Sequence, residues 1–335
     1  MAGGAYKQNT KGEGRAMRRA LIHTDISVAP ELAEGFMITA SDGVELRVGL
    51  WRTDQSCRGT VLIFPGRGDY IELYGHPISA LVAAGYHALV VDWRGHGLSD
   101  RVAANPKVGH IRSFDEYQFD VEAIMKCVDE LALPKPLFVV GHSMGACVAL
   151  RALINGMDVT AAVFSAPMFG IYMASYERAA AWPLTWFLRA IGRGQMYAPG
   201  FNDDSYVFKH DFDSNTLTNS LEEYERWVMQ GTKHPKLHTG GPSMGWLYAA
   251  LKECRDLSTL PSPDVPCLTF CGDQEQTVRV CAIRERLNNW PQGHLEQVQT
   301  AKHELFLELP DVREKVIGQM ISFFGQFEAS DVTQH

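Results

Sequence analysis

The chain has 335 residues, and its composition excludes several classes of protein. Acidic residues outnumber basic ones by 39 to 31, a formal net charge of −8, which disfavours nucleic acid as a partner because phosphate contacts need clustered Lys and Arg. The hydrophobic fraction of 46% is typical of globular proteins. The length suits one large domain with an insertion, and such a chain buries enough surface to fold without disulfides or a structural metal.

Targeting and redox signals predict a cytoplasmic protein in peripheral contact with a membrane at most. Residues 1–19 lack the apolar segment of a secretory signal, and no later stretch has the roughly 18 apolar residues that span a bilayer. The seven cysteines are odd in number and lie mostly in apolar runs, which favours reduced, buried thiols. Cys267 and Cys271 stand within a strand pattern without a partner pair, so we expect no zinc site.

In chain order, the first predicted element is a β-hairpin over residues 35–50, where apolar and polar residues alternate on either side of Asp42-Gly43. Short apolar segments then predict strands covered on both faces, at residues 60–64, 87–92, 136–141, 161–165 and 266–271. Helical patterns lie between them, clearest over residues 117–131 and 312–324. Alternating strands and helices predict an α/β fold with a doubly wound, mostly parallel sheet.

The alternation stops between about residues 170 and 252, where aromatic, acidic and Gly-Pro segments replace the strand signals. We therefore predict an inserted, mainly helical cap. The predicted organisation is a partly flexible N-terminal extension, two core sections separated by the cap, and a tail: residues 1–34, 35–170, 171–252, 253–328 and 329–335.

The strongest chemical signal is Gly141-His-Ser143-Met-Gly145, which follows an apolar strand and precedes a helical run. A serine on such a strand-to-helix turn is held in a strained backbone, and the flanking glycines let strand and helix approach closely. The turn raises the hydroxyl above the sheet beside the free N–H groups of the helix N-terminus. The motif predicts Ser143 as a nucleophile.

A serine hydroxyl needs a base, and the base needs a carboxylate to orient it. His303 is the preferred base, because it follows the probable last strand at residues 294–299 and precedes the C-terminal helix. The acid should follow the preceding strand, where the loop offers Asp273 and Glu275. The spacing alone does not choose between these two carboxylates.

The loop at Gly66-Arg67-Gly68, after the first central strand, is the expected second source of oxyanion donors. We predict an oxyanion hole formed by the backbone N–H groups of Arg67 and Met144, each worth about 3 kcal/mol in the transition state. A dinucleotide site is disfavoured, because no third glycine follows at position 71. We expect no cofactor and no catalytic metal.

These residues resemble the α/β-hydrolase superfamily, within it the branch of bacterial lysophospholipases, monoacylglycerol lipases and serine aminopeptidase-type hydrolases. The resemblance extends over about residues 35–327 and depends most on the segment 92–99, Asp-Trp-Arg-Gly-His-Gly-Leu-Ser, together with the motif at 141–145. The Gly-x-x-Asp-x-x-Val pattern of that branch aligns with residues 272–278 and places Glu275 where the family has aspartate. The resemblance therefore makes Glu275 the first choice of acid and Asp273 the reserve.

The resemblance implies a serine carboxylic-ester hydrolase that forms an acyl-serine intermediate on a small single-chain lipid, a lysophospholipid or monoacylglycerol. Large apolar residues in and beside the cap would suit an acyl chain, and we take Phe169, Trp182, Trp186 and Trp246 as candidate substrate contacts. The alternatives are an aminopeptidase of the same fold and a non-catalytic ligand-binding protein on this fold. Oligomeric state stays open.

Overall fold

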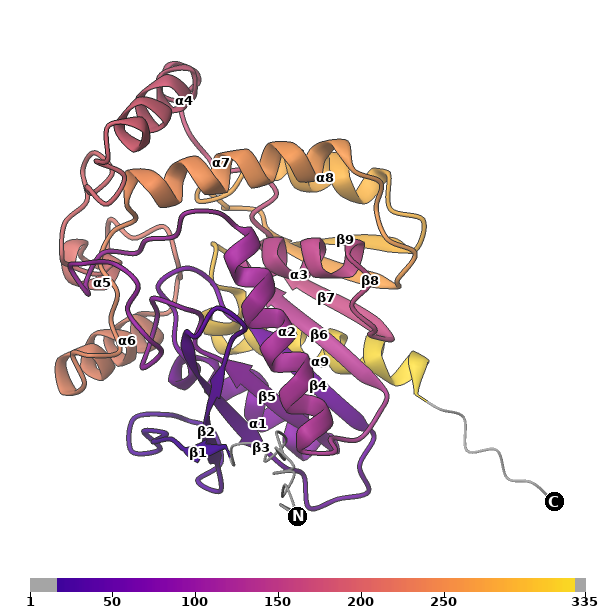
Figure 1. Cartoon of the computed structure of the whole chain (residues 1–335). Helices are drawn as coiled ribbons and strands as arrows, with labels where there is room; N and C mark the ends of the chain where they lie inside the picture. The colour runs from indigo at the N-terminus through magenta and orange to yellow at the C-terminus, as the bar shows by residue number, and fades with distance from the viewer. Residues whose placement is uncertain (1–16, 329–335) are drawn as a thin grey trace, which may run out of the picture.

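The protein is described by a computed structural model in which residues 17–328 are described; residues 1–16 of the predicted N-terminal extension and the predicted tail (329–335) lie outside the described residues. The described chain contains one nine-stranded sheet with the order β1-β2-β3-β5-β4-β6-β7-β8-β9 (Figure 1). The strands are β1 (Arg18–Arg19), β2 (Glu34–Thr39), β3 (Glu45–Trp51), β4 (Gly59–Phe64), β5 (Tyr86–Val91), β6 (Leu137–His142), β7 (Ala161–Ser165), β8 (Cys267–Gly272) and β9 (Gly293–Val298).

The sheet begins antiparallel and continues parallel. β2 and β3 form the predicted hairpin, turning at Gly43, whose φ of 91° suits glycine. β3 is antiparallel to β5, and β5, β4, β6, β7, β8 and β9 then run parallel. All of the predicted strands are present, so the predicted α/β fold with a mostly parallel sheet is confirmed.

Helices cover both faces of the sheet (Figure 1). One hydrophobic core includes side chains of α2, α3, α7 and α8, and a second core on the other face includes those of α1, α6 and α9. The α-helices are α1 (Gly75–Ala83), α2 (Asp115–Glu130), α3 (Met144–Ile154), α4 (Ser175–Ala190), α5 (Tyr206–Lys209), α6 (Leu221–Lys233), α7 (Met244–Thr259), α8 (Val280–Asn288) and α9 (Pro310–Phe324). Short 3₁₀ helices are η1 (Ile71–Tyr74), η2 (Leu305–Leu307) and η3 (Gly325–Phe327).

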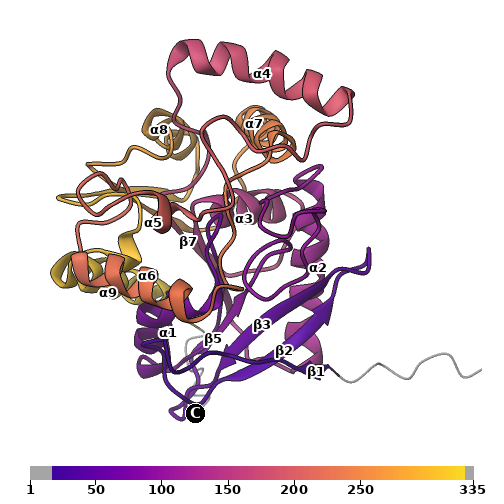
Figure 2. The same ribbon diagram turned by 90° about the vertical axis from the view of Figure 1, so that its left-hand side faces the viewer.

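Helices α4 to α7 all lie between β7 and β8, the segment in which we expected a cap. α4 forms the top of the molecule and packs on α7 (Figure 2). α7 runs through the boundary predicted at residue 252, and its Trp246, Ala250 and Leu257 belong to the core of the domain. An ion pair between Arg151 of α3 and Glu253 (2.7 Å) also joins α7 to the core. α7 is thus shared between the inserted segment and the sheet.

A buried ion network holds the loop after β5. Arg47 of β3 contacts Asp92 at 2.6 Å and Glu72 at 2.7 Å, and all three side chains are inaccessible to solvent. Asp92 also accepts a hydrogen bond from the N–H of Leu98 at 2.7 Å. The aspartate of the segment 92–99 therefore has a structural role, because it fixes the turn beyond the strand.

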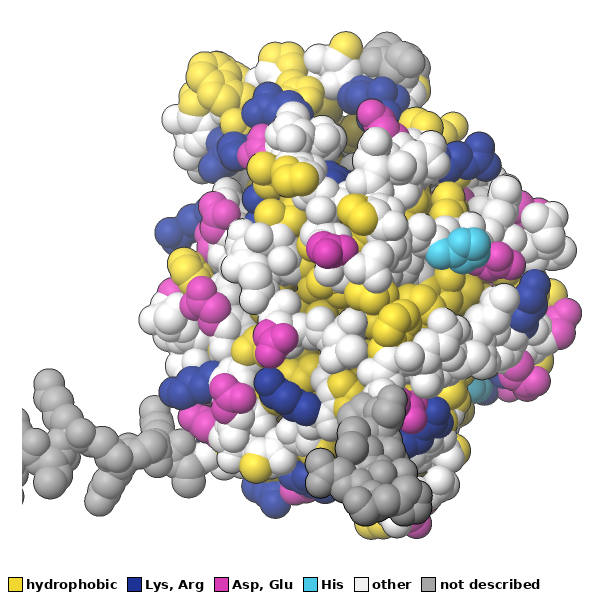
Figure 3. Space-filling model, turned by 90° about the vertical axis from the view of Figure 1, so that its right-hand side faces the viewer, with side chains coloured by type: hydrophobic (Ala, Val, Ile, Leu, Met, Phe, Trp, Pro, Cys, Tyr) yellow, Lys and Arg dark blue, Asp and Glu magenta, His cyan; other side chains and the backbone are white. Residues whose placement is uncertain are grey.

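The surface carries charges of both signs. On the face shown in Figure 3, acidic and basic side chains are interspersed around apolar ones. In the part of the chain that the structure describes, no helix combines the length and apolarity that crossing a bilayer requires.

Candidate active site

Ser143 occupies the turn between β6 and α3. Its backbone has φ 49° and ψ −114°, a conformation that non-glycine residues rarely adopt and that is typical of strained functional sites. A Cβ at Gly141 would lie 2.6 Å from the Cα of Ala146, and a Cβ at Gly145 would overlap the carbonyl oxygen of Phe64. The two glycines are therefore required sterically, as the motif predicted.

The structure brings His303 to Ser143 across 160 residues of sequence. The imidazole comes from the loop between β9 and η2, and its Nε2 lies 3.0 Å from the Ser143 hydroxyl oxygen. The ring is buried, with its Nδ1 2.7 Å from the Glu275 carboxylate. The three groups thus form a continuous chain from acid to hydroxyl.

Glu275 is fixed in the loop after β8. One oxygen contacts His303, and the other accepts hydrogen bonds from the N–H groups of Thr277 at 2.6 Å and Val278 at 3.1 Å. Burial acts to raise the pKa of Glu275, but the imidazole and the two amides outweigh it and hold the pKa below its usual value. An ionised Glu275 selects the His303 tautomer that carries its proton on Nδ1, leaving Nε2 free to accept the serine proton.

The reserve acid is placed differently. Asp273 is exposed, and its carboxylate accepts a hydrogen bond from the N–H of Ala301 at 3.2 Å. It braces the two neighbouring loops, whereas the contact with His303 is made by Glu275. The geometry favours Glu275 as the acid.

The loop after β4 lies against the serine turn. The N–H of Gly66 is already used, because it donates to the Asp69 carboxylate at 2.8 Å and to the Tyr74 hydroxyl at 3.0 Å. Within residues 17–328, neither the N–H of Arg67 nor that of Met144 has a hydrogen-bond acceptor. Both predicted oxyanion donors are therefore free of intramolecular hydrogen bonds within these residues, and their role stays a prediction.

The structure adds a buried polar cluster that sequence reasoning missed. His142 Nε2 lies 3.0 Å from the Glu304 carboxylate, and Asp69 is buried near both. Burial acts to lower the pKa of His142, but Glu304 outweighs it and raises the pKa to about 9. Burial, with Glu304, raises the pKa of Asp69 to about 6. The one sequence signal that could have indicated this cluster is the position of its residues, because His142 directly precedes the predicted nucleophile and Glu304 directly follows the predicted base.

Nitrogen and carboxylate atoms of His142, His303 and Glu304 lie within 4.8 Å of one another, the spacing of a metal site. Both ring nitrogens of His303 are engaged, by Ser143 and by Glu275. A metal ion there would break at least one of these contacts, so the cluster does not suit a metal and the hydroxyl–imidazole–carboxylate chain at once.

The four predicted substrate contacts have different environments. Phe169 and Trp246 are buried in the core, where Phe169 packs edge-on against Phe164. Trp182 joins α4 to α7 by stacking edge-on with Tyr248, at a ring distance of 5.6 Å. Trp186 is 59% exposed. Their contact with substrate stays a prediction.

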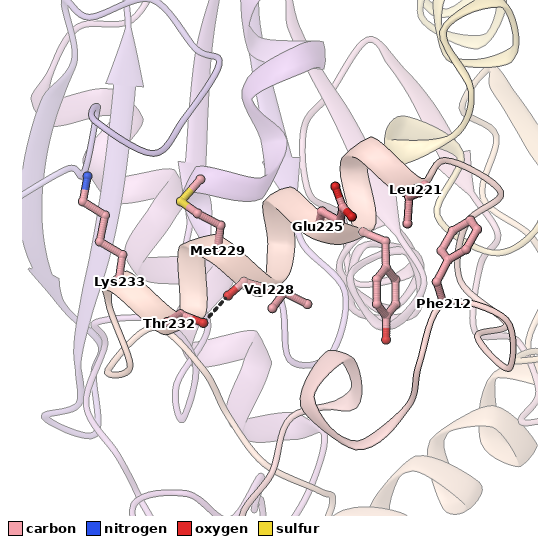
Figure 4. A pocket seen from close by; sticks show the side chains of 8 residues that line it. Phe212, Leu221, Glu225, Val228, Met229, Thr232 and Lys233 are labelled. Atoms are coloured by element: carbon pink, nitrogen blue, oxygen red, sulfur yellow. Dashed lines mark hydrogen bonds between the residues drawn. The ribbon is translucent and has the colours of Figure 1, made fainter.

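A separate surface pocket of about 740 Å³ lies against α6 (Figure 4). Its lining does not include the serine, histidine or glutamate described above. The lining residues are Phe212, Leu221, Tyr224, Glu225, Val228, Met229, Thr232 and Lys233.

The sheet order and the strained serine turn at the carboxyl end of β6 define an α/β-hydrolase fold, as expected from the resemblance. Solved structures agree: a monoglyceride lipase variant from Saccharomyces cerevisiae aligns with a TM-score of 0.68 at 18% identity, covering 88% of this chain and 95% of that one. A monoacylglycerol lipase from Paleococcus ferrophilus aligns with a TM-score of 0.67 at 20% identity, covering 85% and 100%.

Sequence comparison identifies the family. Residues 55–310 match the hydrolase family described as serine aminopeptidase, S33, and the chain belongs to that family. It is also 26% identical over 305 residues to lysophospholipase L2 of Escherichia coli K12, covering 86% of each chain. A probable lysophospholipase L2 of Haemophilus influenzae is 26% identical over 279 residues, covering 82% of this chain and 87% of the relative.

Proposed function

We propose that the protein is a serine hydrolase that cleaves carboxylic esters of single-chain lipids. The observation that carries the proposal is the chain of contacts from Glu275 through His303 to the Ser143 hydroxyl, 2.7 Å and 3.0 Å long, at a strained serine turn. Similarity along most of the chain to proteins named lysophospholipase L2 supports the substrate class.

In the proposed mechanism, His303 Nε2 takes the proton of Ser143 as its oxygen attacks the ester carbonyl carbon. The backbone N–H groups of Arg67 and Met144 donate hydrogen bonds to the developing oxyanion. Collapse of the tetrahedral intermediate breaks the ester bond, and the leaving alcohol takes its proton from His303. Water, deprotonated by His303, then attacks the acyl-serine and releases the fatty acid.

Glu275 has an electrostatic role in this scheme. It orients His303 through Nδ1 and stabilises the imidazolium that forms during each proton transfer. Its ionised state is favoured by its amide donors and by His303 itself, so it holds a negative charge in a site that solvent does not reach. Asp273, exposed and bound to a different amide, takes no part.

We propose that residues 171–252 act as the cap over the acyl chain, with Phe169, Trp182, Trp186 and Trp246 as its candidate contacts. Aromatic and aliphatic side chains gather on α4 and α7, which pack on one another beside the domain core. A lipid tail needs such an apolar lining, whereas a short acyl group does not.

We also propose a cytoplasmic protein whose α4 helix contacts the membrane surface from which lysolipids come. α4 and the turn after it expose four apolar side chains, and the same turn exposes the cationic Arg193. Apolar residues next to cationic ones suit the headgroup region of a bilayer. All seven cysteines are free, which supports a reducing compartment. The exposed apolar residues are Leu184 (42%), Trp186 (59%), Phe187 (52%) and Ile191 (53%).

The test is a substrate series with one enzyme preparation: p-nitrophenyl esters of increasing chain length, lysophosphatidylcholine, a monoacylglycerol and an amino-acyl anilide. The proposal predicts turnover of the long-chain lipid esters and none with a Ser143→Ala control. An optimum at acetyl or butyryl esters without lipid turnover would contradict the lipid assignment. Cleavage of the anilide with little ester turnover would establish the aminopeptidase instead.

A further inference from the structure

Arg67 offers a guanidinium group as well as the backbone N–H of the oxyanion loop. The side chain is largely buried between three segments: the loop that contains Gly109, the loop before α7, and the first turn of α7. Its Nη1 donates to the carbonyl oxygen of Gly240 at 3.3 Å, and its guanidinium carbon lies 5.6 Å from the ring of Trp246. One long hydrogen bond leaves most of its five N–H donors unused.

No carboxylate among residues 17–328 pairs with this cation within 4.0 Å. Arg47 and Arg94, which are almost inaccessible to solvent, contact two and three carboxylates respectively. Arg67 instead resembles the buried Arg286, whose hydrogen-bond acceptors are two backbone carbonyls and the Ser262 hydroxyl. The nearby Asp69 is held by the N–H of Gly66 and the hydroxyl of Tyr74. Burying an unpaired charge is costly, and a bound anion would remove that cost.

The surroundings of Arg67 are rich in donors. The Tyr117 hydroxyl and the Trp246 indole N–H are both buried and lie close to one another, and in the described part of the chain neither has a well-formed hydrogen bond to any other group. Arg101 adds a second positive charge nearby, since burial lowers the pKa of His96 and both Arg101 and Arg67 add to that effect. Arg101 itself is held by backbone carbonyls of Gly97 and Lys236, at 2.7 Å each, and has no carboxylate partner within the described residues.

We infer that the Arg67 guanidinium binds the phosphate group of a lysophospholipid substrate while the N–H of the same residue binds the carbonyl oxygen of its ester. This inference rests on the proposed function. The glycerol unit that separates ester and phosphate has about the length of an arginine side chain, so one residue spans both groups. Arginine suits phosphate because its planar fork donates two parallel hydrogen bonds. A monoacylglycerol has no anion for this site.

The kinetic test compares lysophosphatidylcholine with a monoacylglycerol of the same acyl chain, in wild type, Arg67→Met and Arg67→Lys. We expect the ratio of the two kcat/KM values, lysophospholipid over monoacylglycerol, to fall at least about tenfold in Arg67→Met, the effect of losing hydrogen bonds to a charged group. Arg67→Lys should recover part of the ratio, because it keeps the charge without the fork. The exposed Arg112 provides the matched control, and Arg112→Met should leave the ratio unchanged. An unchanged ratio in Arg67→Met, or equal losses on both lipids, would overturn the inference.

A binding experiment tests the proposed phosphate site at Arg67 without relying on enzymatic turnover. In Ser143→Ala, melting temperatures are measured with glycerol, inorganic phosphate, sn-glycerol 3-phosphate and glycerophosphocholine at equal concentrations. We expect stabilisation by the glycerol-linked phosphates beyond that by inorganic phosphate, and its loss on adding Arg67→Met. Equal stabilisation by all three phosphates would indicate a site for free phosphate, which overturns the headgroup assignment. If wild type cleaves neither lipid, the proposed function fails, and absence of Arg67-dependent stabilisation then separately refutes the anion site.

Discussion

Replacing Glu275 by glutamine tests the acid with the smallest change of shape. The glutamine oxygen can still accept from Thr277 and Val278, and its NH₂ group then faces His303 Nδ1. Because that group donates, it favours the tautomer with a proton on Nε2, which cannot accept the serine proton. Loss of the oriented base in a triad lowers kcat by about 10⁴-fold, or about 5.4 kcal/mol in the activation free energy.

The matched control is Asp273→Asn, two residues away in the same loop. Its carboxylate is exposed and bound to one amide at 3.2 Å, so we expect kcat to change by less than about threefold, in line with the small effects of exposed substitutions. The assay is steady-state hydrolysis of a long-chain p-nitrophenyl ester, with melting curves to verify folding. A Glu275→Gln enzyme within tenfold of wild type, or a larger loss in Asp273→Asn, would refute the assignment of the acid.

Four further outcomes are expected. Arg47→Met should lower the free energy of unfolding by about 3–5 kcal/mol in urea denaturation, because it leaves two buried carboxylates without their cationic partner. A loss below about 1 kcal/mol would be incompatible with the buried ion network of Arg47, Glu72 and Asp92. Gly145→Ala should abolish activity or folding, since the added Cβ would overlap a backbone oxygen; an active, stable variant would mean that the serine turn is built differently. Burial raises the pKa of Glu223, but His76 and its other cationic partners outweigh burial and hold the pKa below its usual value, so its contribution to stability is present above about pH 4.5 and declines as the pH falls. Glu223→Gln should therefore narrow the gap in melting temperature between pH 7 and pH 3, and an unchanged gap would argue against that pKa. Phe187→Ser with Ile191→Ser should reduce sedimentation with anionic phospholipid vesicles while turnover of a soluble short ester stays the same; undiminished vesicle binding would exclude α4 and the turn after it as the contact.

The features that the sequence predicted well depend on local chemistry. A serine between two glycines after an apolar strand has few conformations open to it, so Ser143 could be placed at a strand-to-helix turn. His303 followed from chain order, because the carboxyl ends of parallel strands meet at one edge of the sheet. The hairpin at Asp42-Gly43 was equally local.

Features set by packing could not be predicted in this way. Asp273 and Glu275 differ by two residues in a loop without periodicity, and only the folded backbone shows which one reaches His303. The aromatic residues of the inserted segment were similarly ambiguous, since composition does not reveal which side chains face the core. Trp246 in the first turn of α7 is buried, whereas Trp186 in the middle of α4 is exposed.

The buried pair of His142 and Glu304 was missed for a related reason. Each residue is adjacent in sequence to a predicted catalytic residue, and no separate function was assigned to it for that reason. The two meet only because β6 and the loop after β9 converge on the serine turn, a contact between segments some 160 residues apart. The spacing of residues along the sequence does not indicate that these two segments are in contact.

The most direct test of the central mechanism is covalent labelling with a fluorophosphonate probe, followed by peptide mass spectrometry. We predict one adduct per chain, on the hydroxyl of Ser143, with parallel loss of ester turnover. Ser143→Ala should not be labelled, and His303→Ala should be labelled far more slowly because its serine lacks a base. Ester hydrolysis that survives in Ser143→Ala, or an adduct on any other residue that accompanies inactivation, would contradict the mechanism.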